Sequence, residues 1–283
     1  MSNYEIRPPA NIEEYGQIAD VYQAVFSLRD RANPPAWLME DTTKVGGLTL
    51  GLWDGDKGVG FSWAFAGFDS AGPYLYSSGL GVLPEHRSRG QAYEMKVAQR
   101  TFALELGYRR IKWTFSALRS VNAHLYVTRL GGVGSKYVFD TRGSFDSDWV
   151  TEGGVPLDEF VVEWDLDSPR VRSRLGDDAA EGAERLKPPA DAYCISRCSG
   201  SGPDRVLDEI DTEPSADRVV CEVPADFQYL VNNALDLAMD WRAKTRPAFA
   251  ALMGQGFALT ECFYDREHGP RYLFERGAEG TAR

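Results

Sequence analysis

Residues 81–92 read Gly-Val-Leu-Pro-Glu-His-Arg-Ser-Arg-Gly-Gln-Ala, and they stand where the sequence changes its period. Before them, residues 74–82 form an extended run that is typical of a strand. After them, apolar residues recur every three or four positions through Leu106, and Gly107 follows where a helix would end. The segment therefore predicts a strand that leads through a short loop into a long helix.

The loop in this segment has the composition of an anion-binding site. A helix start presents backbone N–H groups that have no intrahelical partner, together with the positive end of the helix dipole. Gly90 and Ala92 leave room for a diphosphate to approach these amides, and Arg87 and Arg89 add positive charge. The alternative is a tight surface turn that binds nothing.

The rest of the first 167 residues predicts helices and strands around this segment. Asn11 is expected to cap an amphipathic helix that runs to about Phe26, and residues 47–82 are typical of an antiparallel meander. The expected order is strand, two helices, three strands, helix, strand, helix and two strands. The expected ranges are 4–7, 11–26, 37–39, 47–53, 59–68, 74–82, 92–106, 110–115, 119–130, 133–139 and 160–165.

The sequence divides into three parts. Residues 1–167 hold these elements, residues 168–191 are charged and lack an apolar stripe, and residues 192–283 add further strands and helices. We therefore expect a first domain, a charged helix or linker, and a smaller C-terminal domain. Its expected strands are 192–197, 217–223, 257–264 and 272–275, with a helical region after residue 224 in which Pro247 places a kink or a new helix start.

Composition bounds the function. With 42 acidic and 31 basic residues the net charge is −11, which disfavours non-specific binding to nucleic acid. No stretch reaches the ~20 apolar residues of a membrane span, and the N-terminus lacks the pattern of a signal peptide, so we expect a cytoplasmic protein without membrane contact.

The cysteines and histidines give no metal pattern. All four cysteines lie in the last third of the chain, and Cys194 and Cys198 have CxxxC spacing rather than the CxxC spacing of zinc sites. The three histidines are scattered. We expect reduced thiols and no metal, with a disulfide or a metal site as the alternative.

The central segment resembles the signature of the GCN5-related N-acetyltransferases, the GNAT superfamily. That signature is a strand ending in an apolar-Val-x-Pro-Glu run, then (Gln/Arg)-x-x-Gly-x-(Gly/Ala), then a long helix, and residues 81–92 match it position by position. Residues 125–131, Leu-Tyr-Val-Thr-Arg-Leu-Gly, are similar to the family's Leu-Tyr-x-x-x-Leu-Gly helix end. The resemblance covers residues 3–167 and points to a branch of predicted acetyltransferases with a C-terminal extension.

The resemblance implies a mixed α/β (α+β) GNAT fold, with a central, mostly antiparallel sheet flanked by helices. Residues 192–283 echo the first domain, because a helix end at residues 249–257 and a final strand at 271–275 parallel its closing elements. We interpret this region as a partial GNAT-like α/β domain. Because it contains no RxxGxG pattern, we expect no second coenzyme A site in it.

The resemblance also implies where coenzyme A binds. Amides of the loop and the helix start would hold the pyrophosphate, and the pantetheine arm would lie between splayed strands 74–82 and 110–115. The implied cofactor-binding residues are Val82, Arg87, Ser88, Arg89, Gly90, Gln91, Ala92 and Asn122. Gln91 is bulkier than the family's usual residue, and Ala92 replaces the more common second glycine.

Three further residues are implied in catalysis. Gly79 and Gly81 suit a β-bulge that exposes backbone groups, so an amide near Leu80 could stabilise an oxyanion. Tyr126, four residues after Asn122 on a helix, would protonate the leaving thiolate, whereas the alternative is a ring packed in the core.

The general base is left open by the sequence. Tyr76 is one candidate for this role. The carboxylates Asp140, Asp146 and Asp148 in the loop before the closing strand are others, although acidic loop residues are usually only solvated. Deprotonation of the amine can also run through water.

A cluster in the C-terminal part has two interpretations. Residues 241–246 read Trp-Arg-Ala-Lys-Thr-Arg, and the i, i+4 spacing puts Arg242 and Arg246 on one helix face. They could bind an anionic substrate or the 3′-phosphate of the cofactor. An inter-domain network of salt bridges is the favoured interpretation.

These observations predict an acyl-CoA-dependent N-acyltransferase, in which an amine attacks the thioester of acetyl-CoA or another acyl-CoA directly. The expected partners are the acyl-CoA and a small-molecule amine acceptor, with a homodimer as one option for the assembly. Other acyl chemistry remains open: O-acylation, transacylation from a donor other than coenzyme A, or decarboxylation of an acyl thioester. A non-catalytic acyl-CoA-binding protein is a further alternative.

Overall fold

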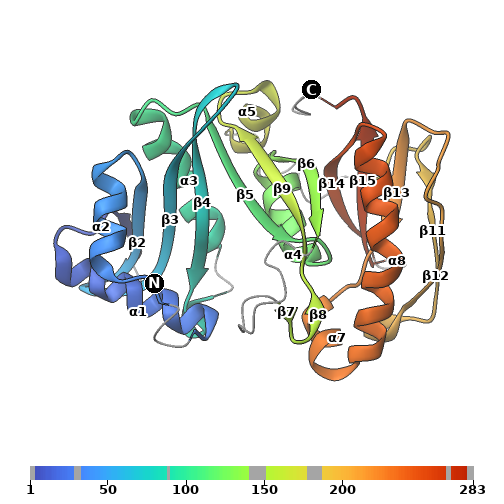
Figure 1. Ribbon diagram of the computed structural model, residues 1–283, viewed down its shortest axis with the longest axis horizontal. Coiled ribbons are helices and arrows are strands. Elements are labelled where there is room, and N and C mark those ends of the chain that lie inside the picture. The colour runs from blue at the N-terminus through green and yellow to red at the C-terminus, as the bar shows by residue number, and fades with distance from the viewer. Residues whose placement is uncertain are drawn as a thin grey trace. The chain divides into compact units, whose positions relative to one another are not determined.

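The structure is a computed structural model that describes residues 4–28, 33–87, 90–139, 151–176, 187–265 and 269–278 (Figure 1). By its internal contacts the chain divides into two compact units. Unit 1 comprises Met1–Trp113 and Asp165–Asp167, and unit 2 comprises Thr114–Trp164 and Ser168–Arg283. The domain bounds expected from the sequence, 1–167, 168–191 and 192–283, stay a prediction.

Unit 1 contains the first half of the expected element order. Its elements are β1 (Tyr4–Arg7), α1 (Ile12–Phe26), α2 (Ala36–Lys44), β2 (Leu48–Asp54), β3 (Lys57–Asp69), β4 (Gly72–Val82), a 3-10 turn (Pro84–His86), α3 (Gln91–Glu105) and the first residues of β5 (Arg110–Ser116). The strands lie in the order β1-β2-β3-β4-β5, antiparallel except for the parallel pair β4 and β5. The predicted meander is confirmed.

Helix α1 forms for the reasons that the sequence indicated. The Asn11 side chain accepts a hydrogen bond from the Glu14 amide at 2.9 Å, which caps the first turn. Tyr15, Ile18 and Tyr22 are buried on one stripe against the sheet. The helix ends at Phe26, and the next residue takes a left-handed conformation.

The two faces of the unit 1 sheet carry different helices. Gly79 and Gly81 of β4 face α1, because a Cβ at either position would meet side chains of that helix. Ser62 of β3 faces α3, where its hydroxyl accepts a hydrogen bond from Gln99 at 2.8 Å. The sheet is therefore covered by α1 on one face and by α3 on the other.

Unit 2 contains the remaining elements. They are α4 (Ser120–Ala123), a π-helix (His124–Arg129), β6 (Val133–Phe139), β7 (Thr151–Glu152), β8 (Val155–Pro156), β9 (Asp158–Asp165), α5 (Pro169–Leu175), β10 (Tyr193–Cys194), β11 (Ser196–Ser199), a 3-10 turn (Gly202–Asp204), β12 (Val206–Ile210), β13 (Arg218–Glu222), α7 (Phe227–Asn233), α8 (Leu235–Gly254), β14 (Phe257–Asp265) and β15 (Gly269–Arg276). The fold is thus mixed α/β, with mostly antiparallel sheet pairing and flanking helices, as predicted.

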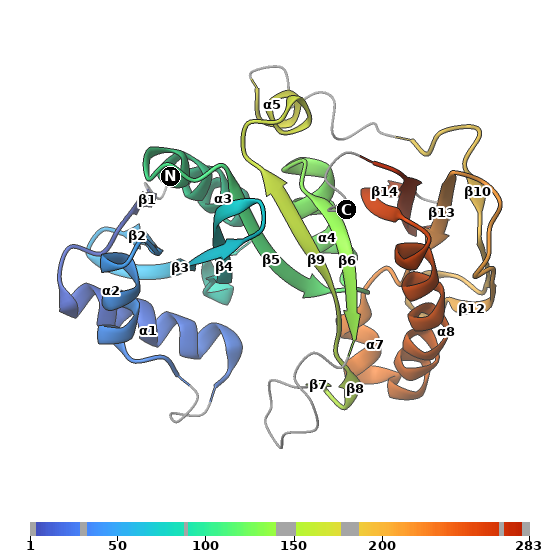
Figure 2. The same ribbon diagram turned by 45° about the horizontal axis from the view of Figure 1, so that its top comes forward.

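Unit 2 repeats one topology twice. The chain runs from β5 through helices into the hairpin β6–β9, and β9 lies between β5 and β6. It later runs from β13 through α7 and α8, which Figure 2 shows, into the hairpin β14–β15, and β15 lies between β13 and β14 (Figure 1). The two hairpins meet antiparallel at Gly134 and Leu259, where a Cβ on the glycine would lie 2.9 Å from the Leu259 Cβ. This repeat agrees with the interpretation of residues 192–283 as a partial second copy.

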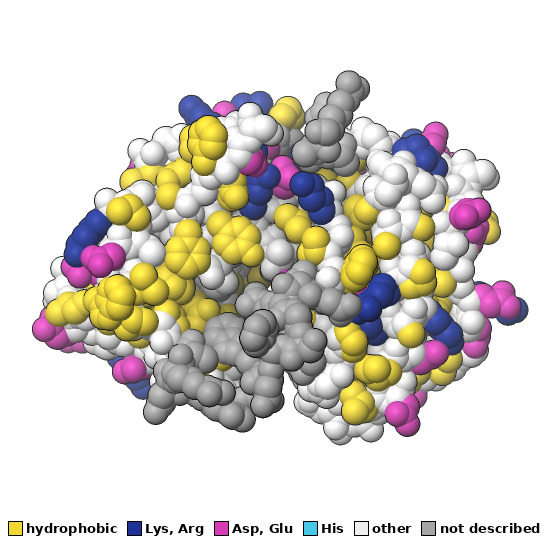
Figure 3. Space-filling view, in the orientation of Figure 1, with side chains coloured by type: hydrophobic (Ala, Val, Ile, Leu, Met, Phe, Trp, Pro, Cys, Tyr) yellow, Lys and Arg dark blue, Asp and Glu magenta, His cyan; other side chains and the backbone are white. Residues whose placement is uncertain are grey.

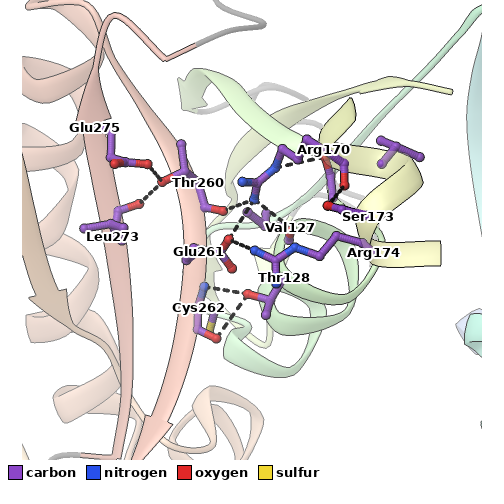
Figure 4. A network of polar contacts seen from close by, with 12 residues as sticks. Val127, Thr128, Arg170, Ser173, Arg174, Thr260, Glu261, Cys262, Leu273 and Glu275 are labelled. Carbon is purple, nitrogen blue, oxygen red and sulfur yellow. Dashed lines mark hydrogen bonds and ion pairs between the residues drawn. The ribbon is translucent and has the colours of Figure 1, made fainter. Parts of the chain in front are cut away.

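Helix α5 shows that part of the expected charged linker is ordered structure. Arg170 and Arg174 of this helix both donate to Glu261 on β14, and Arg170 also donates to the Val127 carbonyl at 3.2 Å (Figure 4). Thr128 and Cys262 exchange reciprocal hydrogen bonds beside them. Residues 177–186, the rest of the most charged stretch, lie outside the described residues.

Two expectations about elements are wrong, and a third is confirmed with a different geometry. Residues 119–130 are helical as expected, but as a single α-turn followed by a π-helical turn. Pro247 does not start a new helix, because α8 continues through it and buries neighbouring Ala248 and Phe249. Residues 192–197 are two strands rather than one, because β10 pairs with β13 while β11 turns away to pair with β12.

Acidic and basic side chains are interspersed on the face drawn in Figure 3. Of the helices in the described ranges, none combines the length and the apolar character needed to span a bilayer. Within those same ranges no group of three or more His, Cys, Asp or Glu side chains is arranged to hold a metal ion.

Candidate active site

The predicted anion-binding loop begins with a tight turn at residues 83–87, and Gly90 at the start of α3 is left-handed. The His86 amide donates to the Leu83 carbonyl at 2.9 Å, and the Arg87 amide donates to the Pro84 carbonyl at 3.2 Å. Gly90 has a φ of 87° and caps α3. Apart from its chain neighbours and the backbone of α3, no described residue has an atom within 4 Å of the position that a Cβ on Gly90 would take.

Helix α3 begins at Gln91 and runs for 15 residues. Its Tyr93 and Glu94 amides both donate to the Gly90 carbonyl, at 2.9 and 3.1 Å, so regular helical geometry is established from the first turn. The first amides of such a helix point along its axis, away from its body, and carry the positive end of its dipole. This geometry is suited to an anionic group such as a phosphate.

Two side chains of the loop have structural roles that the sequence did not indicate. The Arg87 Nε donates to the Val82 carbonyl at 2.7 Å, so this guanidinium fastens the loop to the end of β4. Gln91 is 2% exposed, which means that its bulk is directed into the protein and does not obstruct the helix start. Ser88 and Arg89, two other predicted cofactor-binding residues, lie outside the described residues.

Strand β4 contains the predicted bulge, but at Ser78. In the register with β3, Trp63 faces Gly79 while Ala64 faces Ser77, so Ser78 has no partner. The extra residue reverses the side-chain alternation, and residues 77 and 79 consequently point to opposite faces of the sheet. Bulges of this kind are frequent beside active sites.

Gly79 and Gly81 have a packing reason that is separate from the bulge. A Cβ at Gly81 would lie 2.5 Å from Val25 Cγ1 of α1 and 2.9 Å from Phe61 Cε1. A Cβ at Gly79 would lie 3.0 Å from Phe61 Cε2. Helix α1 therefore approaches the backbone of β4 more closely than any residue with a side chain would permit.

Tyr76 and Leu80 lie on β4 on either side of the bulge. Tyr76 is part of the short parallel ladder, which pairs Leu75 with Ile111 and Tyr76 with Lys112. Leu80 lies opposite Ser62 of β3. The bulge therefore separates the part of β4 that pairs with β5 from the part that leads into the anion-binding loop.

Asn122 and Tyr126 belong to unit 2, where they lie on α4 and the π-helix. The Tyr126 ring packs edge-on against Phe115, with centroids 5.7 Å apart. Burial raises the pKa of Tyr126 to about 12, so its hydroxyl stays protonated at neutral pH and can act only as a proton donor there. A π-helical turn is a rare conformation that is often found at functional sites.

The cluster of arginines on α8 forms the predicted salt-bridge network. Arg246 donates to both carboxylate oxygens of Asp158, at 2.7 and 2.9 Å, and Tyr137 donates to the same carboxylate at 2.6 Å. Arg242 lies 3.8 Å from it. Asp158 precedes residue 167 and Arg246 follows residue 191, so this network joins the two expected domains inside unit 2.

The other carboxylates proposed as a general base, Asp140, Asp146 and Asp148, lie outside the described residues. The structure instead contains a titratable group that sequence reasoning missed. Lys96 of α3 is 1% exposed, and its ammonium contacts β4 and β5.

Lys96 was missed because the buried stripe of α3 was assigned to the wrong residues. The expected stripe was Ala92, Met95, Ala98, Phe102 and Leu106, whereas the buried residues are Gln91, Met95, Lys96, Gln99 and Ala103. Leu106 is 54% exposed. The sequence did contain a signal for this arrangement. Lys96 and Gln99 are three residues apart beside Met95, so two polar side chains lie on the helix face that packs against the sheet.

No family model matches the chain, and no curated protein matches it either. Solved structures align with part of it. The protein yncA from Salmonella typhimurium, with its cofactor acetyl-CoA, has 17% identity and a TM-score of 0.47, and the match covers 59% of this chain and 96% of the other. An N-acetyltransferase from Staphylococcus aureus Mu50 has 17% identity and a TM-score of 0.46, with 58% and 99% covered. A GNAT family acetyltransferase from Elizabethkingia anophelis with acetyl-CoA bound has 12% identity and a TM-score of 0.43, with 58% and 99% covered.

Proposed function

We propose that this chain is an acyl-CoA-dependent N-acyltransferase that transfers an acetyl or other acyl group to a small-molecule amine. The observation that carries the proposal is the left-handed Gly90 at the start of α3, directly after a strand with a bulge at Ser78. The helix start supplies amides for the pyrophosphate of coenzyme A. The bulge frees backbone groups of β4 that can contact the acyl thioester.

The residues of the loop fit a diphosphate better than they fit a neutral ligand. Gly90 places no side chain at the start of α3, and its left-handed φ of 87° favours glycine there. Arg87 holds the loop against β4 through the Val82 carbonyl, which keeps the helix start and the strand end in a fixed relation. In this proposal Ala92, Gln91 and Gly90 contact the phosphates through their backbone, and Ser88, Arg89 and Asn122 are further cofactor contacts.

The chemistry requires no covalent intermediate on the protein. Bound acyl-CoA would supply an activated thioester, and holding an amine beside it converts a bimolecular reaction into an effectively unimolecular one. An amide near Leu80 would stabilise the oxyanion, and the Tyr126 hydroxyl, which is protonated at neutral pH, would donate a proton to the leaving thiolate. Tyr76 is a candidate for the general base.

The experiment is an assay of free thiol released from acetyl-CoA in the presence of a panel of primary amines, with each product identified by mass spectrometry. An N-acylated product that forms only with the protein supports the proposal. Ester products would indicate O-acylation, and transfer without acyl-CoA would indicate another donor. Binding of acetyl-CoA without any product would indicate an acyl-CoA-binding protein, and failure to bind acetyl-CoA would overturn the proposal.

A further inference from the structure

Lys96 is enclosed between α3 and the sheet of unit 1. Its Nζ donates to the Ser77 hydroxyl at 3.0 Å and to Gln99 Oε1 at 2.9 Å, and it lies 3.8 Å from the centroid of the Trp113 ring. The side chain is 1% exposed. Burial lowers the pKa of Lys96 to about 7, so the charged and neutral forms are both populated near neutral pH.

The surrounding hydrogen bonds accommodate both forms. Gln99 Nε2 donates to the hydroxyls of Ser62 and Ser77, which fixes Gln99 Oε1 as an acceptor for Lys96. When Lys96 is charged, it donates to the Ser77 oxygen, so the proton of the Ser77 hydroxyl points away from Lys96. When Lys96 is neutral, its lone pair can accept that proton, so the hydrogen bond between Lys96 and Ser77 reverses direction. Proton uptake by Lys96 is thereby coupled to the orientation of one hydroxyl.

The Ser77 hydroxyl lies next to the point where β4 stops pairing with β5. Ser77 directly follows Tyr76, the last residue of β4 in the parallel ladder with β5, and directly precedes the bulged Ser78. Trp113 likewise follows Lys112, the last residue of β5 in that ladder. Lys96 thus contacts both strands at the point where their pairing ends, which is where the proposed thioester contact begins.

Lys96 contacts uncharged groups of three elements, Ser77 of β4, Trp113 of β5 and Gln99 of α3, and Gln99 in turn contacts Ser62 of β3. Strand β2 is uncharged from residue 48 to residue 53. Of the charged residues on these elements, Glu94 of α3 is exposed, and others have partners elsewhere. Lys112 and Arg110 pair with Asp69, and Arg100, one turn after Lys96, donates to the Leu166 carbonyl.

We propose that Lys96 is the proton acceptor of the acyl transfer and that the Ser77 hydroxyl is its relay. The inference rests on the proposed function. As the acceptor nitrogen bonds to the acyl carbon and the C–S bond breaks, a proton passes from that nitrogen to Ser77 Oγ while the Ser77 proton passes to Lys96 Nζ. Tyr126 gives its proton to the thiolate, which leaves as a thiol, and regains a proton from water, while Lys96 releases its proton through Ser77 to water and is again neutral. Lys96 does not touch the substrate in this proposal. It takes up the proton through Ser77 and so positions the path of proton transfer.

The kinetic test compares pH profiles. Wild-type kcat/KM for acetyl-CoA, measured with an accepted amine at fixed concentration, should rise with a midpoint near pH 7, where neutral Lys96 forms in the free protein. Lys96→Met should lower kcat by about 10²–10⁴-fold and remove this midpoint, because general-base assistance has that size, while the KM for acetyl-CoA stays the same. Ser77→Ala should have the same effect on the midpoint. The control Lys57→Met, at an exposed position at the start of β3, should keep the wild-type profile.

A second measurement needs no acceptor. NMR of lysine-labelled protein, with Lys96→Met to assign the signal, gives the midpoint of the Lys96 titration. Acetyl-CoA should raise this midpoint relative to the free protein, since a Ser77 hydroxyl that donates to the acyl carbonyl favours charged Lys96. Binding of acetyl-CoA by calorimetry with an unmoved Lys96 midpoint, or a folded Lys96→Met variant with the wild-type pH profile, would overturn this inference alone. Absence of acetyl-CoA binding would instead overturn the proposed function.

Discussion

Arg246 of α8 donates to both carboxylate oxygens of Asp158, which begins β9 and is fully buried. The two residues lie 88 positions apart in the chain. Tyr137 completes the carboxylate's contacts with a hydrogen bond of 2.6 Å. A bidentate, partly desolvated pair of this kind fixes the position of α8 against the start of β9 within unit 2.

Arg246→Ala should therefore destabilise the protein strongly. Removing one partner leaves a buried carboxylate without its bidentate donor, which costs about 3–5 kcal/mol in other proteins. Urea denaturation gives the free energy of unfolding. The matched control is Arg218→Ala, which removes an ion pair with Asp191 whose two side chains are 46% and 66% exposed. The control should lose less than about 1 kcal/mol. Equal losses of unfolding free energy in the two variants would show that the buried pair stabilises the protein no more than the exposed one.

Lys96 should make the stability of the protein depend on pH in a defined direction. Its pKa is about 7 in the folded protein and lies near the ordinary 10.5 in the unfolded chain. Between these values the unfolded state binds more protons, so the free energy of unfolding rises with pH by up to about 1.4 kcal/mol per unit. Below pH 7 both states are charged and the contribution is constant.

Subtracting the unfolding free energy of Lys96→Met from that of the wild type isolates this contribution from other titrating groups. The difference should rise in favour of the wild type from pH 7 to pH 10, as measured by urea denaturation at several pH values. A difference that is flat over this range would mean that Lys96 titrates normally in the folded protein.

Tyr126→Phe tests the proposed proton donor. Burial raises the pKa of the Tyr126 hydroxyl to about 12, so the hydroxyl carries the proton that the leaving thiolate needs. Removing this proton donor should lower kcat by about 10²-fold or more. Binding of acetyl-CoA, measured by calorimetry, should be unchanged. The control is Tyr264→Phe, which removes another unit 2 hydroxyl whose pKa is also raised to about 12 and which donates to Ser120. A comparable loss of kcat in both variants would assign Tyr126 a structural role.

The close approach of α1 to β4 is tested by two glycine substitutions. Gly81→Ala should cost about 1–3 kcal/mol, because its Cβ would lie 2.5 Å from Val25 Cγ1 in a packed interior. Gly16→Ala, in the middle of α1, has no neighbour within 4 Å of the new methyl and should gain about 0.5–1 kcal/mol from helix propensity. Opposite signs in thermal denaturation are expected, and a stabilised Gly81→Ala variant would contradict this packing.

Much of unit 1 was predictable because its signals are local. Asn11 caps α1, Gly90 introduces α3, and the meander strands are separated by turn residues, so each element follows from residues near it in the sequence. The bulge was expected from Gly79 and Gly81 but lies at Ser78. Gly79 and Gly81 are instead required by the close approach of α1 to β4. This approach depends on packing between segments that are distant in the sequence.

The spacing of apolar residues predicted neither the burial of Lys96 nor the π-helical turn. The polar cluster of Lys96, Gln99, Ser77 and Ser62 is stabilised by contacts across three elements, and it replaces the regular apolar stripe that periodicity assumes. The π-helical turn at Tyr126 was not told apart from an α-helix, because an apolar spacing of three or four residues does not separate the two. The salt-bridge interpretation of Arg246 was available from charge alone, but its partner Asp158 was not.

The most direct test of the account is a calorimetric titration of the wild type, Gly90→Asp and Gly90→Asn with coenzyme A. Both substitutions place a side chain of the same shape at a φ of 87°, and they differ only in charge. The account predicts that the wild type binds coenzyme A and that Gly90→Asp binds at least about tenfold more weakly than Gly90→Asn, because a carboxylate occupies the anion position at the helix start. Equal affinities in the two variants, or no binding by the wild type, would contradict the assignment of this loop as the coenzyme A site.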